Sequence, residues 1–337
     1  MKHKIVVAGC GAMSNVWLDY VEKRENAEIV GLVDLYIESA KKMADRRNLQ
    51  VPCFVDLSKA IKETGPNLVL DITIPASHKE IATTAMEAGC NVFGEKPIAE
   101  TLEDAKAVLQ VAQQTGKKYS VMQNRRYNRQ IRALQQVVAN NVIGKVGSIH
   151  ADFFLGPHFG GFRDVMDNPL IVDMAIHTFD QARFITGADA VSVYCHEYNP
   201  AGSWYEGNSS AVCIFEMSDG SVFTYRGSWS AIGMQTSWES DWRVTGSIGS
   251  AKWDGHHFPV CEIRDSSKPI EFVDHIKSVE IKDNWNGQEG HWGCLDEMFS
   301  ALEENRLAET DCTDNIKSME MVFGAVESAK KGKKVLL

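Results

Sequence analysis

The sequence lacks the features typical of secreted, membrane-spanning and disulfide-rich proteins. No uninterrupted run reaches the roughly 18 apolar residues of a membrane span, and no signal-peptide core precedes the strand expected from Lys4 onward. The eight cysteines are scattered and include no C-x-x-C pair, so we expect reduced, mostly buried thiols. We therefore expect a cytoplasmic protein that does not enter a membrane.

An excess of positive charge is also lacking. Across 337 residues, 35 lysines and arginines are set against 45 aspartates and glutamates, which gives a net charge of −10. A protein of this sign repels a phosphate backbone, so nucleic acid is not expected as a partner. Internal repeats, low-complexity segments and obvious flexible linkers are lacking too. The chain is long enough for two domains, each with its own core.

What the sequence does contain, at its beginning, is the pattern of a dinucleotide-binding turn. Residues 4–8 form a run rich in β-branched side chains that leads into Gly9 and Gly11, and Ser14 takes the third small position. Gly9 permits a sharp turn, and Gly11 lets backbone N–H groups approach a pyrophosphate at the N-terminus of the following helix. The glycine spacing alone also occurs in purely structural turns, which are the alternative.

A second strand, expected over residues 29–34, ends in Asp34. An acid about 20 residues beyond the glycines accepts hydrogen bonds from the ribose hydroxyls of adenosine. Its charge would repel the 2′-phosphate of NADP, and Leu35 and Tyr36 supply no cation to offset that repulsion. The pattern favours NAD over NADP as the cofactor, against the alternative of a solvated acid at a strand end.

Strand and helix patterns alternate through the first third of the chain, which predicts a parallel, doubly wound sheet with right-handed crossovers. The expected strands lie at residues 4–8, 29–34, 67–73, 91–95 and 118–122, and the expected helices at 14–23, 36–47, 57–63, 77–88 and 102–114. We expect this nucleotide-binding domain to occupy residues 1–123.

After residue 123 the pattern changes to that of a second domain over residues 124–337. Residues 148–154 alternate as an antiparallel strand does. Further strand-like runs lie at 191–198, 210–217, 222–230, 240–245 and 251–253, with helices expected at 130–140, 170–186, 290–305 and 313–330. The predicted fold class is α/β: an N-terminal Rossmann domain, then an α+β domain with a mostly antiparallel sheet backed by helices.

Ligands of open parallel sheets bind at the carboxyl ends of the strands. Thr73 and His78 follow one expected strand, and Glu95-Lys96-Pro97 follows the next. Pro97 restricts Lys96 to an extended conformation, in which a desolvated lysine can hydrogen-bond a substrate oxygen or relay its proton. A surface lysine before a helix is the alternative, and His78 also fits an ordinary helix start.

The sharpest constellation in the second domain is Asp173, His177 and Asp180. On a helix, Asp173 and His177 share one face, and a carboxylate beside an imidazole raises its basicity and fixes its tautomer. Such a histidine can act as general base when a hydroxyl loses its proton as its carbon loses hydride. An ion pair on a helix surface is one alternative. A metal site that includes His256 and His257 is another, but no third strong ligand cluster is evident, and no metal is expected.

Two loops of the second domain carry further binding candidates. The first, residues 156–163, contains turn residues, aromatics and His158, and is expected to lie over a site. The second contains Trp204, whose ring suits the C–H face of a sugar or cyclitol, whereas most strand tryptophans fill sheet cores. An open aromatic face of the sheet also fits a subunit interface.

Together these motifs resemble the Gfo/Idh/MocA oxidoreductases, the family of glucose–fructose oxidoreductase and inositol dehydrogenase. The combination of E-K-P with a downstream D-x-x-x-H is specific, and beyond about residue 185 only the architecture is similar. The motifs, in the family's order, are Gly9-Cys10-Gly11-Ala12-Met13, Pro75 to His78, Glu95-Lys96-Pro97, Arg125-Arg126-Tyr127, and Asp173 with His177 and Asp180. The chain has Ala175 where the family often has glycine, a small departure.

The resemblance implies an NAD-binding Rossmann domain and a second domain whose large open sheet is often buried in homodimers or homotetramers. Lys96 would contact both the nicotinamide ribose and the substrate hydroxyl, His177 would act as acid and base, and Asp173 would orient His177. The expected cofactor contacts are Gly9, Gly11, Ala12, Met13, Asp34, Thr73, Pro75, His78, Glu95, Lys96 and Asn124. The expected substrate contacts are Lys96, Arg126, Asp173 and His177, with His158 and Trp204 from the loops.

The predicted function is reversible, NAD-dependent oxidation of a secondary hydroxyl on a sugar, sugar derivative or cyclitol, with Lys96, Asp173 and His177 as catalytic residues. One alternative is an enzyme that cleaves glycosides through transient oxidation by tightly bound NAD. Another is a nucleotide-sensing protein without catalysis. A sensor needs only the site of the first domain, so the presence of Asp173 and His177 counts against it.

Overall fold

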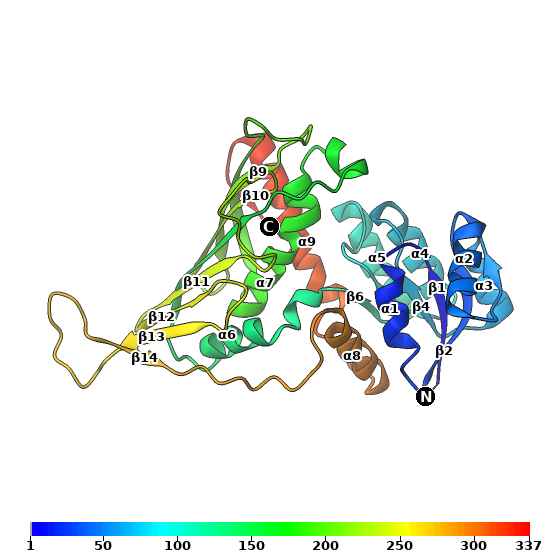
Figure 1. Ribbon diagram of the computed structural model, residues 1–337, viewed down its shortest axis with the longest axis horizontal. Helices are drawn as coiled ribbons and strands as arrows, with labels where there is room; N and C mark the ends of the chain where they lie inside the picture. The colour runs from blue at the N-terminus through cyan, green and yellow to red at the C-terminus, as the bar shows by residue number, and fades with distance from the viewer. Residues whose placement is uncertain (1) are drawn as a thin grey trace. The chain divides into compact units, whose positions relative to one another are not determined.

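The computed structural model describes residues 2–337, which divide into two compact units (Figure 1). The first unit contains the residues up to 124 together with 288–319, and the second contains 125–287 together with 320–337. The sequence pattern places everything after residue 123 in one domain. The structure differs over residues 288–319, which pack with the first unit.

The first unit is built on a parallel sheet in the order β3-β2-β1-β4-β5-β6, counted over the described residues. Every adjacent pair of its strands is parallel, and the order is that of a Rossmann fold, which confirms the predicted doubly wound sheet. The strands are β1 His3–Ala8, β2 Ala27–Val33, β3 Cys53–Phe54, β4 Leu68–Asp71, β5 Asn91–Gly94 and β6 Tyr119–Val121.

The helices of the first unit begin and end at residues with clear local causes. The Asp56 side chain accepts a hydrogen bond from the Lys59 N–H at the start of α3, and Thr101 caps α5 in the same way. Gly65 and Gly116 end those two helices in the left-handed conformation. The helices are α1 Ser14–Val21, α2 Ile37–Arg47, α3 Leu57–Thr64, α4 Pro75–Glu87, α5 Leu102–Thr115 and α8 Gly290–Glu303.

The helix α8 belongs to the first unit because its apolar side chains fill that unit's core. The Phe299 ring packs against the rings of Tyr20 and Phe93, with centroids 5.9 and 5.1 Å away. The Tyr20 hydroxyl also donates a 2.5 Å hydrogen bond to Asp296. The core of this unit is therefore completed by residues from late in the sequence.

The second unit contains a nine-stranded sheet in the order β14-β13-β12-β11-β7-β10-β9-β8-β15, counted over residues 2–337. All of its pairs are antiparallel except β7 with β10, so the expectation of a mostly antiparallel sheet is confirmed. The strands are β7 Val146–Phe154, β8 Ala190–Tyr198, β9 Ser210–Met217, β10 Val222–Ser228, β11 Asp241–Gly246, β12 Gly249–Trp253, β13 Val260–Arg264, β14 Ile276–Val279 and β15 Val335–Leu336.

One face of this sheet is covered by helices. Phe179 on α7 is fully buried against Phe215, Phe223 and Tyr225, which project from β9 and β10. The helical segments are α6 Arg129–Ala139, the π-helix η3 Pro169–Ala175, α7 Ile176–Thr186, and two 3-10 segments, η1 Asn124–Arg126 and η2 Gly161–Val165. The last helix, α9 Cys312–Lys331, contributes its first part to one unit and the remainder to the other.

The expected single helix over residues 170–186 is wrong in one respect. Its first part is a π-helix, and regular α-helix begins only at Ile176. A wider π turn commonly marks a functional site. The change from π to α falls between Asp173 and His177, the two residues that the sequence singles out.

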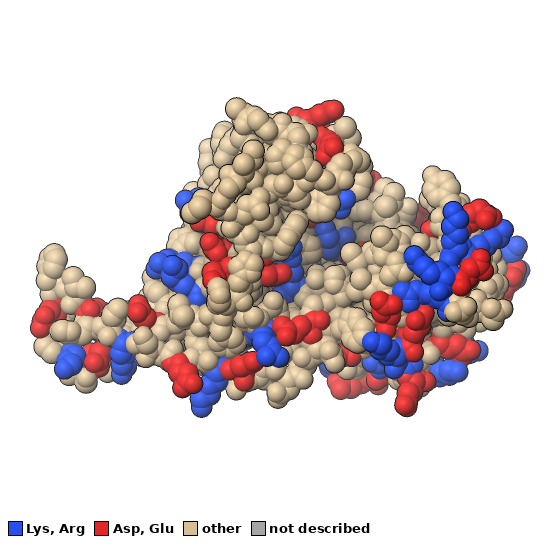
Figure 2. All heavy atoms as spheres, in the orientation of Figure 1, with Lys and Arg blue, Asp and Glu red and all other residues tan. Residues whose placement is uncertain are grey.

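The described residues include no helix long and apolar enough to cross a membrane. All eight cysteines are free thiols. On the face shown in Figure 2, acidic and basic residues are interspersed over the first unit, while the end of the second unit near β9 and β10 is largely uncharged.

Candidate active site

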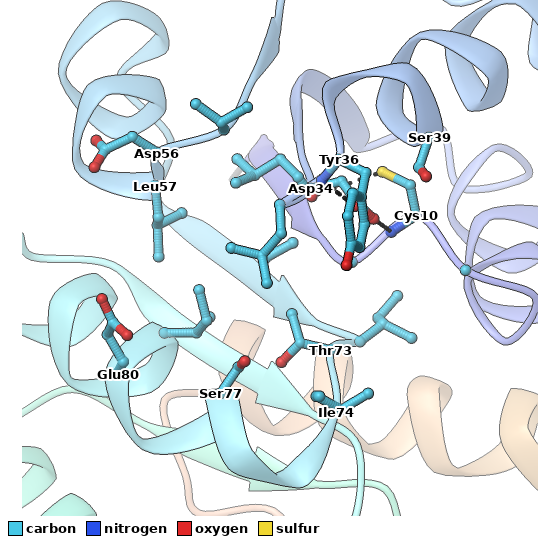
Figure 3. Close-up of a pocket in the computed structure, with 18 of the residues that line it drawn as sticks. Cys10, Asp34, Tyr36, Ser39, Asp56, Leu57, Thr73, Ile74, Ser77 and Glu80 are labelled. Atoms are coloured by element: carbon cyan, nitrogen blue, oxygen red, sulfur yellow. Dashed lines mark hydrogen bonds between the residues drawn. The ribbon is translucent and has the colours of Figure 1, made fainter. Parts of the chain in front are cut away.

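A cleft of about 520 Å³ lies at the carboxyl edge of the parallel sheet (Figure 3). Its walls come from the glycine turn after β1, the end of β2, the loop before α3, and the turn from β4 into α4. Six of the predicted cofactor contacts line it: Gly9, Gly11, Ala12, Met13, Asp34 and Thr73. Their convergence on one cleft follows from the parallel topology, which brings strand ends to the same edge.

The two glycines of the turn are constrained differently. Gly9 has a φ of +90°, and a Cβ built there would lie 2.4 Å from the Ile72 carbonyl oxygen. A Cβ on Gly11 would have no protein atom within 4 Å. Gly9 is therefore required by the fold itself, whereas the space beside Gly11 is open to a ligand. This difference fits a pyrophosphate that passes over Gly11.

Asp34 is fixed at the end of β2 by two backbone donors. The Cys10 N–H donates to Oδ2 and the Tyr36 N–H donates to Oδ1, each at 2.9 Å. Figure 3 shows this link between the glycine turn and Asp34 on one side of the cleft. The carboxylate is thus held rigidly at the position where ribose hydroxyls are recognised in this fold.

Cys10 fills space in the turn instead of providing a reactive group. Its side chain is buried, and burial together with the nearby charge of Asp34 raises the pKa of its thiol to about 12. The thiol stays protonated at neutral pH and is a poor nucleophile.

The turn after β4 is organised by buried polar side chains. Asp71 is fully buried, and its Oδ1 accepts hydrogen bonds from the Thr73 N–H and hydroxyl. Burial raises the pKa of Asp71 above its ordinary value. His78 is also fully buried, with Nδ1 2.6 Å from the Pro97 carbonyl oxygen and Nε2 3.2 Å from that of Thr73. His78 therefore joins the turn to the cis Lys96–Pro97 bond.

A polar cluster lies at the ends of β5 and β6, near Lys96 in the sequence. Glu95 accepts a 2.8 Å hydrogen bond from the indole N–H of Trp17, and Asn124 Nδ2 lies 3.5 Å from His291 Nδ1. Burial lowers the pKa of His291. Nothing local in the sequence points to His291, because it begins α8 and reaches this cluster only through the fold.

In the second unit, the predicted catalytic acid is already paired. Arg163 Nε donates a 2.6 Å hydrogen bond to Asp173 Oδ2. His177 lies at the start of α7 and is buried, with 8% of its surface exposed. The proximity of Lys96, in the first unit, to His177, in the second, stays a prediction.

Asp180 and Arg126 form a buried ion pair. Arg126 Nε and Nη2 each lie 2.7 Å from one carboxylate oxygen of Asp180, and both residues are at least 95% buried. Such a fork fixes α7 to the segment before α6. The predicted substrate contact of Arg126 is thus a guanidinium with a carboxylate already bound.

The two loop candidates meet each other. The Trp204 indole N–H and the Tyr205 hydroxyl donate to the Pro157 carbonyl oxygen at 3.2 and 3.0 Å. The His158 ring stacks on Trp204 with centroids 3.7 Å apart. His158 and Trp204 therefore form one corner, in which the loop of residues 156–163 is fixed to the loop that contains Trp204.

A metal centre gains no support from the fold. Within residues 2–337, no group of three or more histidine, cysteine or acidic side chains is arranged to hold a metal ion. His257 Nδ1 lies 2.6 Å from Asp254 on an exposed turn after β12. The alternative that combined His256 and His257 with Asp173 thus has no described cluster behind it.

The fold and cleft are those of a dinucleotide-binding Rossmann domain, and sequence comparison gives the class of protein as an oxidoreductase. Residues 3–123 match the oxidoreductase family with NAD-binding Rossmann fold, and residues 131–252 match the GFO/IDH/MocA C-terminal domain. The chain belongs to the GFO/IDH/MocA family of oxidoreductases, which confirms the resemblance seen in its motifs.

Individual relatives are distant. The chain is 26% identical to D-glucoside 3-dehydrogenase of Escherichia coli, over 59% of each protein. It is 28% identical to inositol 2-dehydrogenase of Pseudomonas fluorescens, over 57% of each. A crystal structure of an oxidoreductase from Agrobacterium radiobacter, in complex with NAD+, L-tartaric acid and magnesium, has the same fold, with a TM-score of 0.86 and 20% identity over 100% of this chain and 98% of that one.

Proposed function

We propose that this protein is an NAD-dependent dehydrogenase that reversibly oxidises a secondary hydroxyl of a sugar, sugar derivative or cyclitol. The observation that carries the proposal is the cleft in which open space beside Gly11 faces the anchored carboxylate of Asp34. The named activities of the glucoside and inositol dehydrogenases support the substrate class.

The residues of the cleft fit the adenosine and pyrophosphate parts of NAD. The carboxylate of Asp34 would accept the ribose hydroxyls, the backbone around Gly11 would hold the pyrophosphate, and the apolar side chains of Leu35, Val55 and Leu57 would border the adenine. The negative charge of Asp34 favours NAD over NADP. When bound, the nicotinamide supplies the acceptor for a hydride.

The chain's own catalytic groups would be Lys96, Asp173 and His177. His177 removes the hydroxyl proton, because a buried imidazole can exchange a proton near neutral pH. Lys96 stabilises the negative charge that develops on the oxygen, and Asp173 orients His177 and binds a substrate hydroxyl.

The test is a screen for NADH formation with monosaccharides, cyclitols and sugar acids, run in parallel with NADP. The best substrate is then given to the His177→Ala and Lys96→Ala variants. We expect His177→Ala to lower turnover by a factor on the order of 10²–10⁴ with NAD affinity nearly unchanged. Full turnover by that variant would remove His177 from the reaction.

A second copy of the chain is the partner that we propose for the uncovered face of the nine-stranded sheet. Val191, Tyr194, Val212 and Ile214 on β8 and β9 each expose between 38% and 45% of their surface there. Such neighbouring apolar side chains fit a homodimer or homotetramer. Sedimentation of wild type and Ile214→Asp tests this, because a monomeric wild type would contradict it.

We also propose that the enzyme acts in the cytoplasm. Cys195 Sγ and Cys213 Sγ lie 3.4 Å apart in the core as free thiols, an arrangement suited to a reducing compartment. Localisation of a tagged protein by cell fractionation checks it.

A further inference from the structure

Three exposed aromatic side chains adjoin the candidate catalytic acid in the second unit. Phe159, Phe162 and Trp238 expose 53%, 56% and 44% of their surface, and we call them the aromatic patch. The guanidinium of Arg163 lies over the rings of Phe159 and Phe162, and the same guanidinium pairs with Asp173. One arginine therefore connects the patch directly to Asp173.

The patch comes from two loops that the sheet holds side by side. The Ala231 N–H donates to the Leu155 carbonyl at 3.1 Å, and a Cβ on Gly156 would lie 2.4 Å from the Ala231 carbonyl oxygen. Across this junction the Phe159 ring lies 6.2 Å from that of Trp238. Apolar Ile232 and Met234 extend the exposed surface along the second loop.

Both loops are anchored, so the patch is a preformed surface. Trp204 and Tyr205 fix Pro157, and the Arg125 guanidinium donates to the Trp238 carbonyl oxygen. The Phe159 ring also rests against Trp229, whose indole is buried. Exposed aromatic rings are unfavourably hydrated, so an apolar ligand that covers them would be stabilised by the hydrophobic effect.

A free monosaccharide or cyclitol presents only the small C–H faces of its ring to such a surface, and hydroxyls surround those faces. A glycoside differs, because its aglycone projects from the sugar away from the oxidised carbon. If the sugar lies against Asp173, an aglycone on the side of Arg163 meets the rings of Phe159 and Phe162. The exposed rings thus offer more apolar area than the C–H face of one sugar ring covers, and an aglycone would fill the remainder.

We propose, building on the dehydrogenase function above, that the natural substrate is a glycoside with an aromatic or other apolar aglycone that packs on Phe159, Phe162 and Trp238. The sugar would carry the oxidised hydroxyl, and the patch would determine specificity without taking part in the chemistry.

The experiment measures kcat/KM for NADH formation with matched methyl and phenyl glycosides of the common hexoses, beside the free sugars and cyclitols. Wild type should prefer the phenyl glycoside of its sugar by about tenfold or more, the gain expected from burying one aromatic ring. Phe159→Ala combined with Phe162→Ala should abolish that preference by lowering kcat/KM for the phenyl glycoside about tenfold more than for the methyl glycoside. Both side chains are exposed, so the variant should fold, as thermal unfolding will verify.

The control is Phe272→Ala, which removes a fully exposed ring from the turn between β13 and β14 of the same unit. It should keep the phenyl preference. A wild type that turns over free sugars or methyl glycosides as well as phenyl glycosides overturns the inference but leaves the dehydrogenase proposal standing. Absence of NADH with every compound overturns the dehydrogenase proposal itself. A patch variant that changes the oligomeric state in sedimentation shows that a second copy covers the patch, and also overturns the inference.

Discussion

Asp173 Oδ2 lies 2.6 Å from Arg163 Nε. Asp173, on the π-helix that precedes His177, is therefore paired with the arginine of a neighbouring segment. The pair has 17% and 31% of its two side chains exposed, which makes the attraction stronger than that of a fully solvated pair. The orientation of Asp173 therefore depends on the loop that contains Arg163.

Arg163→Ala should lower kcat/KM by about ten- to a hundredfold, because Asp173 would lose the partner that orients it. The kcat/KM of Arg163→Lys should lie between those of wild type and Arg163→Ala, since lysine keeps the charge but not the planar fork. Steady-state kinetics on the best substrate of the screen provide the measurement. Arg226→Ala, which breaks an exposed pair with Asp152, is the control and should change kcat/KM little. Equal activity of all four proteins would show that the pair is incidental.

Alanine at Gly9 should impair folding, whereas alanine at Gly11 should impair NAD binding. Gly9→Ala should cost several kcal/mol of stability, or prevent folding, because its Cβ would meet the Ile72 carbonyl at a positive φ. Gly11→Ala should fold normally but bind NAD at least about tenfold more weakly, because the methyl group would occupy the space expected for the pyrophosphate. Thermal unfolding and NAD titration separate the two. Unchanged NAD affinity in Gly11→Ala would contradict the placement of the cofactor.

Asp34→Ala should weaken NAD and reduce the discrimination against NADP by a factor on the order of ten. The ratio of kcat/KM for the two cofactors is the readout. Glu80→Ala removes another acid that lines the same cleft and should leave that ratio as it is. An unchanged ratio in Asp34→Ala would exclude Asp34 from the cofactor site.

Glu197 should make stability depend on pH. Burial raises the pKa of its carboxyl from 4.5 to about 7, and Asn168 donates its amide to one oxygen at 2.9 Å. The folded protein thus keeps a proton that the unfolded chain loses, so the free energy of unfolding should fall as pH rises from 4.5 to about 7. Glu197→Gln should remove most of that fall, on the order of 3 kcal/mol.

Urea unfolding at pH 5 and pH 8 tests the role of Glu197. Glu262→Gln, which alters an exposed acid on β13, is the control and should follow wild type. A wild type whose stability does not decline between these values would show that Glu197 ionises normally.

The buried fork between Arg126 and Asp180 should be essential for stability. Asp180→Ala should cost about 3–5 kcal/mol, because it strands a buried guanidinium. Arg126→Met combined with Asp180→Leu should recover much of that loss. The activity of the double variant then decides the predicted substrate contact of Arg126: near-wild-type kcat/KM would assign Arg126 to structure alone.

The sequence predicts the parallel sheet of the first unit well because the signals for its strands are local. The β-branched runs mark the strands, and the glycines and Asp34 mark where two of them end. The parallel topology then brings the strand ends together. Residues 148–154 illustrate a limit of this reasoning. Their alternation shows that one face of the strand is buried, but it does not show the direction of the neighbouring strands, because an antiparallel neighbour such as β11 and a parallel neighbour such as β10 give the same pattern.

Other features depend on contacts between distant segments. β13 and β14 were not expected, because their outward side chains and exposed turn give weak alternation. No residue pattern distinguishes the π-helix before His177 from an ordinary α-helix, so the sequence does not predict it. His291, 167 residues from Asn124, reaches it only through the packing of α8. The corner of His158 and Trp204 joins two loops whose sequences do not predict that they meet.

The position of α8 near the end of the sequence has a consequence for folding during synthesis on the ribosome. The parallel sheet is complete once residue 121 has been translated, yet the ring of Phe299 that covers Tyr20 and Phe93 follows much later. Until then the nascent chain carries an uncovered apolar wall, the kind of surface that chaperones recognise. A fragment that stops at residue 124 would lack α8, so this apolar surface would stay exposed and the fragment should precipitate. The nucleotide-binding unit therefore needs residues from both ends of the sequence to fold stably.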